Sequence, residues 1–343
     1  MLRESRMEII ISAKHYKNEG DEPEQEIKEQ TLLVHKDFIL QVIPIIAKDL
    51  DISNLKSIII PENFKEELSS FQKENNLPVE MTDNEHGVCK GKTMNLKDGS
   101  ESAVIFLDKD CLLYYAADNI IQKIPYGEEI IATVYRARSF WVNTLHHELC
   151  HVDERNKRKS ISWLQNRRID PAEPFDRYLD LAMILFEEYY ACRKSSGTHF
   201  ILGLDTNNLV DEVRIIESEI FAKRTAYNDG KISLESFFQF FVSYSRLLLT
   251  RVAYALGNYY CVDDDKRKEQ YNWLSDKLDG TNAGEILHEL DMALNNLYEV
   301  YPQWENENVL EDLADLVGYY YLLFRITLHN HGESLFISIP PLD

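Results

Sequence analysis

The chain has 343 residues, 44% of them hydrophobic and 28% charged, which is the composition of a globular protein with one large domain or about two smaller ones. Its formal net charge of -21 repels nucleic acid phosphates and anionic lipids, so we expect neither nucleic acid nor a membrane as a partner. Five scattered cysteines without C-x-x-C spacing, and the lack of a signal peptide or an apolar membrane-spanning run, predict a cytoplasmic protein with free thiols.

The first third of the chain predicts a mixed α and β region. Short β-branched runs bounded by polar residues, proline or glycine indicate three strands: Glu8–Ile11, Ser57–Ile60 and Ala103–Leu107. Apolar residues at helical spacing indicate helices at 37–48 and 63–75. The stretch 79–92 is expected to form a hairpin with the last of the three strands.

From about Gly127 onward, apolar residues recur at three and four positions, which is typical of helices. The expected helices are Arg136–Lys157, Pro171–Lys194, Asn208–Tyr227, Leu234–Tyr260, Lys266–Leu278, Ala283–Tyr301 and Val309–Thr327. We expect His329-Asn330-His331 to form a solvated turn and the last residues an extended tail. This gives three segments: a sheet subdomain at 1–127, core helices at 128–200 and a helical region at 201–343.

The run His147-Glu148-Leu149-Cys150-His151 lies within the first of these helices. Residues four apart share one face of a helix, so the imidazoles of His147 and His151 can bind a single metal ion. Glu148, beside them, can then take a proton from a water held by that ion. This is the H-E-x-x-H arrangement, and it predicts Zn²⁺ as cofactor with Glu148 as general base.

Two other interpretations of this run stay open. His146 and Cys150 have the same spacing, but this pair lacks the following glutamate that a hydrolytic site needs. Alternatively, His147 and His151 are partly exposed histidines beside a salt-bridging Glu148. We favour the register of His147 and His151 because it alone supplies both the ligands and the base.

A catalytic zinc site needs a third protein ligand, and neither glycine nor histidine follows His151 at the spacing of the extended motif. The next strong helix carries Glu187 and Glu188 in an otherwise apolar stretch, where a buried carboxylate is costly unless a cation meets it. At this point the chain, from about Gly87 to Arg193, resembles the gluzincins. In these thermolysin-like metallopeptidases, a glutamate from a second helix completes the zinc site.

The resemblance implies further assignments. In that family a small residue often follows the glutamate ligand by three positions, as Ala191 follows Glu188, so Glu188 is the expected ligand and Glu187 the alternative. The family places an acid one turn beyond the ligand to orient a histidine, where this chain has Cys192. It also implies that Ala103–Leu107 is an edge strand along which an extended peptide would align.

We therefore expect an α+β zincin-like domain, with a small mixed sheet on the motif helix and a glutamate helix that closes the site, followed by an all-α region. The expected function is zinc-dependent hydrolysis of a peptide or protein substrate. One alternative is a non-catalytic protein of the same fold that binds a partner or senses a ligand. Another is a helical interaction protein with a chance motif. The sequence selects no residue for stabilising the oxyanion.

Overall fold

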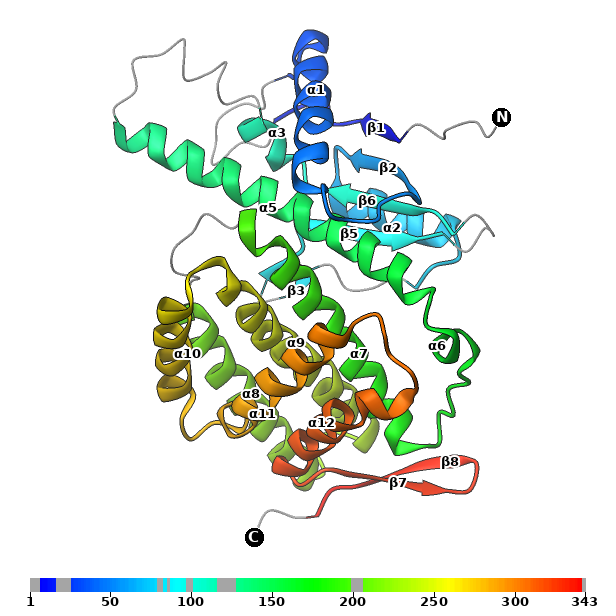
Figure 1. Ribbon diagram of the computed structural model, residues 1–343. Coiled ribbons are helices and arrows are strands. Elements are labelled where there is room, and N and C mark those ends of the chain that lie inside the picture. The colour runs from blue at the N-terminus through cyan, green and yellow to red at the C-terminus, as the bar shows by residue number, and fades with distance from the viewer. Residues whose placement is uncertain are drawn as a thin grey trace. The chain divides into compact units, whose positions relative to one another are not determined.

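The computed structural model describes residues 7–16, 26–78, 83–84, 87–96, 101–115, 128–198 and 206–340 (Figure 1). The chain divides into two compact units: residues 1–156 with 197–201, and residues 157–196 with 202–343. The division falls near the end of the motif helix. The first unit carries the main sheet, and the second is mostly helical.

The first unit contains a four-stranded sheet in the order β1-β2-β6-β5. The strands are β1 (Glu8–Ile11), β2 (Leu55–Ile60), β5 (Gly91–Asn95) and β6 (Ala103–Leu107). β1, β2 and β6 run parallel, whereas β5 is antiparallel to β6. The three strands predicted from β-branched runs are confirmed. Every residue of β6 is buried, since it has a strand on each side and a covered surface on each face.

Helices cover both faces of this sheet. In this unit they are α1 (Glu29–Ile46), α2 (Phe64–Glu74), α3 (Asp110–Tyr115) and α5 (Glu128–Arg158). α1 and α5 share one apolar cluster, in which Ile39 and Leu145 join Ile105 of β6. α2 packs on the opposite face, where Leu68 joins Val104. The alternation of Val104 and Ile105 between the two clusters follows from the period of two in a strand.

The edge strands of this sheet are β1 and β5. The expectation that Ala103–Leu107, which is β6, forms an edge is therefore wrong. β6 lies between β2 and β5. The strand that forms a hairpin with β6 is β5, which begins at Gly91, near the end of the expected stretch 79–92. Its sequence, GKTMN, lacks the β-branched run that marks the other strands, so its position could not be read from the sequence. A short ribbon of β3 (Asp83–Asn84) and β4 (Gly87–Val88) precedes it.

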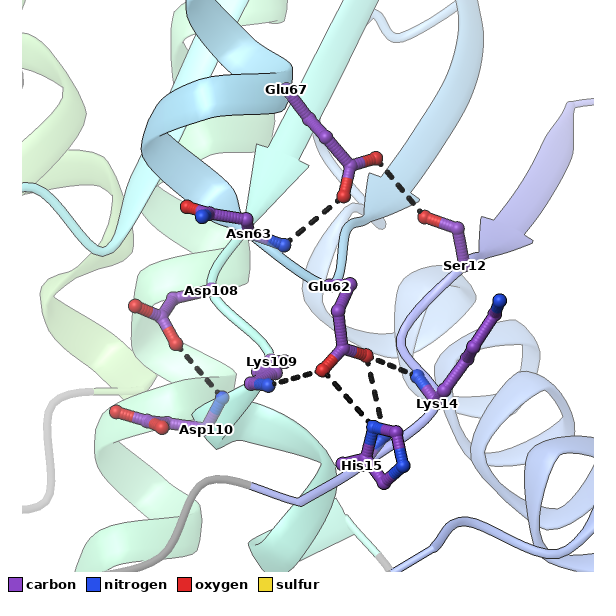
Figure 2. A network of polar contacts seen from close by, with 9 residues as sticks. All are labelled: Ser12, Lys14, His15, Glu62, Asn63, Glu67, Asp108, Lys109 and Asp110. Carbon is purple, nitrogen blue, oxygen red and sulfur yellow. Dashed lines mark hydrogen bonds and ion pairs between the residues drawn. The ribbon is translucent and has the colours of Figure 1, made fainter. Parts of the chain in front are cut away.

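At the carboxyl ends of the parallel strands, polar contacts around Glu62 join three loops (Figure 2). The Glu62 carboxylate accepts hydrogen bonds from Lys109 Nζ at 2.7 Å, from the backbone N–H of His15 at 3.2 Å and from that of Lys14. Burial opposes the negative charge, but the hydrogen bonds from Lys109 and the two backbone groups outweigh it and lower the pKa of Glu62 to about 2. One side chain thus ties together the loops that follow β1, β2 and β6.

The second unit has a single large apolar core formed by its helices. They are α6 (Ser162–Asn166), α7 (Pro174–Ser195), α8 (Thr206–Asn228), α9 (Leu234–Asn258), α10 (Asp264–Leu278), α11 (Asn282–Val300) and α12 (Glu311–Leu323). Its short 3₁₀ segments are η2 (Tyr259–Cys261) and η3 (Glu307–Leu310), whereas η1 (Ser196–Thr198) follows α7 where the chain passes into residues 197–201 of the first unit. The long helices predicted from apolar periodicity are confirmed. Among the described residues, no helix is long and apolar enough to cross a membrane.

The sequence predicted an all-α C-terminal region, and this prediction is wrong. β7 (Thr327–His331) and β8 (Ser334–Ser338) form an antiparallel hairpin. Gly332 adopts φ 71° in the two-residue turn, a conformation that favours glycine. His329 and His331 therefore belong to a strand rather than to a turn. Their strand is mostly exposed and lacks the alternation of apolar residues that would have marked it.

We predict that Glu62→Gln destabilises the protein by about 1 kcal/mol at neutral pH, since these hydrogen bonds to a charged group are partly exposed. The lowered pKa means that the carboxylate stabilises the fold above its unfolded pKa of about 4.3. That contribution is lost as the pH falls toward the folded value of about 2. In urea unfolding, the difference in unfolding free energy between wild type and Glu62→Gln should become smaller below about pH 4.

The matched control is Glu74→Gln, which changes an exposed carboxylate at the end of α2. We expect it to leave the unfolding free energy within about 0.5 kcal/mol of wild type. If the difference in unfolding free energy between wild type and Glu62→Gln stays constant with pH, the proposed role of this carboxylate is contradicted.

Candidate metal centre

The motif lies on α5, which is anchored to the sheet by one apolar face. Leu145, Leu149 and Val152 recur at spacings of four and three and join the buried cluster beneath the sheet. At about 100° per residue, His147 and His151 lie about 200° and 240° around the helix from Leu145. The helix therefore presents the two histidines on the side turned away from the sheet.

The two imidazoles converge through their Nε2 atoms, which are 3.1 Å apart. Two nitrogens bound to one tetrahedral zinc, each at about 2.0–2.1 Å, are separated by about 3.3 Å, so this distance suits two ligands of one ion. It also suits a hydrogen bond between the two rings. His147 and His151 are 9% and 8% exposed, so the interpretation that they are partly exposed histidines is wrong.

A carboxylate completes a group of three possible ligands. His147, His151 and Glu188 each offer one ligand atom, and these atoms all lie within 4.8 Å of one another. The group could hold a metal ion. Glu187, the alternative third ligand, instead forms an ion pair with Arg158 at 2.6 Å.

α7, the helix that carries this carboxylate, is fixed in the second unit by close packing. A Cβ at Gly257 of α9 would lie 2.7 Å from the Tyr189 carbonyl oxygen and 2.8 Å from Cys192 Cβ, so the approach requires glycine. One turn beyond Tyr189, Arg193 pairs with Glu299 at 2.6 Å. Cys192 thus lies in the contact with α9, where the resemblance had implied an acid.

Glu148 lies against the edge strand β5. The Thr93 hydroxyl is 2.7 Å from Glu148 Oε2 and 2.9 Å from the Glu148 carbonyl oxygen, so both acceptors are within reach of its single proton. A Cβ on Gly91 would lie 2.9 Å from Glu148 Oε1 and 3.0 Å from its Cγ. Glycine therefore lets the strand reach the helix. Sequence reasoning missed both residues, whose only signal is their spacing of two on one face of a strand.

Two further acids directly after the motif were also missed. Asp153 and Glu154 are completely buried. Asp153 accepts a hydrogen bond from the backbone N–H of Asp51 at 2.7 Å, which holds the loop before β2 against α5. This turn of α5 is therefore part of the interior.

The chain matches no protein-family model, no curated protein and no solved structure. Membership of the gluzincins is therefore not shown. The findings are a mixed α and β fold and a group of two histidines and one glutamate that could hold a metal ion.

We predict that Gly91→Ala destabilises the protein by about 1–3 kcal/mol, because the new methyl group overpacks the contact with Glu148. Gly197→Ala is the matched control, since a Cβ there meets nothing within 4 Å. It should change the unfolding free energy by less than about 0.5 kcal/mol. Equal effects of the two substitutions in urea unfolding would show that the approach at Gly91 is not tight.

Proposed function

We propose that the protein is a zinc-dependent peptidase in which His147, His151 and Glu188 hold the ion and Glu148 is the general base. The observation that carries this proposal is the convergence of the three ligand atoms within 4.8 Å of one another. Two of them come from the helix that also carries Glu148.

The donor set supports a catalytic rather than a structural ion. Structural zinc sites usually have four protein ligands, whereas two histidines and a glutamate leave a coordination position open. Zinc bound there would act as a Lewis acid that polarises a peptide carbonyl and lowers the pKa of water. The buried setting of His147 and His151 strengthens such electrostatic effects, since it excludes much of the solvent.

Glu148 is suited to move the proton. Thr93 lies within hydrogen-bond distance of Oε2, and this contact restricts the carboxylate to one orientation. Oε1 would accept a proton from the attacking water, and the carboxylic acid so formed would return it to the leaving amine nitrogen. The chain thus supplies both proton transfers of peptide hydrolysis from one side chain.

The outer edge of β5 is suited to align a peptide. The carbonyl of Lys90 accepts from Asp108 N–H, and the N–H of Leu96 donates to the Ser102 carbonyl, so both face β6. By alternation, the backbone groups of Gly91, Thr93 and Asn95 face outward. The Gly91 carbonyl already accepts from Cys89 Sγ at 2.8 Å and the Thr93 carbonyl from Arg155 at 3.5 Å, so a substrate would pair with the other outward groups. An extended substrate added there as a further strand would run past Glu148, which contacts Thr93.

The ligand assignment predicts the metal content of the purified protein. Wild type should hold about one zinc per chain, and the double variant His147→Ala, His151→Ala should hold almost none. Glu188→Ala should weaken zinc binding, whereas the matched change Glu187→Ala should not, because Glu187 pairs with Arg158. A chelator should lower the melting temperature of wild type alone. Equal, negligible zinc in wild type and the double variant would reject the site.

The role of Glu148 predicts a separation of binding from turnover. Glu148→Gln should keep its zinc but cleave a peptide library about 10²–10⁴-fold more slowly, because it removes the base and keeps the side-chain shape. Glu187→Gln makes the same chemical change next to the proposed ligand and should retain turnover. Wild type that binds zinc yet cleaves nothing would instead indicate a non-catalytic protein that uses the site for binding.

A further inference from the structure

Arg155 lies on α5 beside the proposed catalytic glutamate. It follows His151 by four positions and Glu148 by seven, so Glu148 and Arg155 are two turns apart on one side of the helix. This side contacts β5, as the hydrogen bond between Thr93 and Glu148 shows. The guanidinium is therefore placed along the same strand as the base.

Neutral oxygens of β5 hold the guanidinium in position. Arg155 Nη1 donates to the Thr93 carbonyl oxygen at 3.5 Å, one of the groups that faces away from β6. With the Asn95 amide turned so that its oxygen faces Arg155, that oxygen accepts from Nε at 3.1 Å and from Nη1 at 2.8 Å. Thr93 thus contacts both Arg155 and Glu148. The guanidinium and the proposed general base therefore lie on either side of one residue of the strand.

The charge of Arg155 has no carboxylate partner among the residues that the structure describes. Two arginines of the second unit differ: Arg158 pairs with Glu187 and Arg193 pairs with Glu299, each at 2.6 Å. The chain has 58 acidic and 37 basic residues, so an acid partner would be easy to supply. A half-buried guanidinium held only by neutral oxygens has the N–H groups of Nη2 available for an anion.

We propose that Arg155 binds a carboxylate of the peptide substrate and so makes the protein selective for substrates with a negative charge close to the cleaved bond. This inference rests on the proposed function, because it places the substrate along β5. The carboxylate has two possible sources. It is either the C-terminal carboxylate, as in an exopeptidase, or an aspartate or glutamate side chain, as in an endopeptidase. Both present the same planar pair of oxygens to the guanidinium.

The test measures binding of short, N-acetylated peptide mixtures, in which the tested carboxylate is the only charge, to the zinc-loaded Glu148→Gln protein, in which cleavage does not interfere. Three mixtures are compared: amidated peptides containing one glutamine, the same peptides with a free C-terminus, and amidated peptides with glutamate in place of the glutamine. We expect one of the two carboxylate mixtures to bind about 10-fold more tightly than the amidated glutamine peptides, as for a charge-assisted hydrogen bond. The mixture that does so identifies the source.

Added Arg155→Met should abolish this preference and leave binding of the neutral mixture unchanged. Lys159→Met is the matched control, because it removes an exposed positive charge from the turn directly after the same helix, and the preference should persist. If Arg155→Met does not fold, Arg155→Gln retains a side chain that can hydrogen-bond to β5 and removes only the charge.

Equal binding of the three mixtures, no binding of any mixture, or a preference that survives both Arg155 substitutions would overturn the inference. The proposed function is tested by a separate measurement. It fails if zinc-loaded protein with Glu148 intact cleaves none of the three mixtures. A binding preference without cleavage would retain Arg155 as an anion-recognition residue in a non-catalytic protein.

Discussion

The contact between Thr93 and Glu148 is the constraint on which the proposed site depends, because it joins the outermost strand of the sheet to the motif helix. Without it, Glu148 would be one more helical acid with several accessible rotamers. With it, the carboxylate has one orientation, and the strand that would align a substrate lies in contact with the group that would act on it. Gly91 is part of the same constraint, since any side chain there would separate strand from helix.

Electrostatics near this contact differs from that of the molecule as a whole. The formal net charge of -21 would repel an acidic peptide at a distance. At physiological ionic strength, however, exposed charges farther apart than about 8 Å are largely screened. A guanidinium in direct contact with a carboxylate is screened much less. Bulk charge alone would favour a basic substrate, whereas the proposed role of Arg155 depends on a contact at short distance, where screening is weaker.

The sequence predicted those parts of the fold that depend on local pattern. The β-branched runs predicted the three parallel strands, the apolar period predicted the long helices, and the spacing predicted the histidine pair. It could not predict features created by contacts between distant segments. GKTMN has no strand pattern of its own and becomes β5 by pairing with β6. Asp153 and Glu154 look like solvated helix-end residues until the loop at Asp51 and the surrounding structure cover them. Glu188 could be chosen only through a family resemblance, because two adjacent acids look alike in sequence.

α5 has three different faces. One packs on the sheet through Leu145 and Leu149, one carries the paired imidazoles, and one contacts β5. Each added or removed residue turns everything beyond it by about 100°. An insertion or deletion between His147 and His151 would therefore turn one imidazole away from the other, and one between Leu145 and His147 would turn both imidazoles relative to the apolar face. Every residue from Leu145 to Glu154 is buried, so the geometry of the helix fixes the length of this segment.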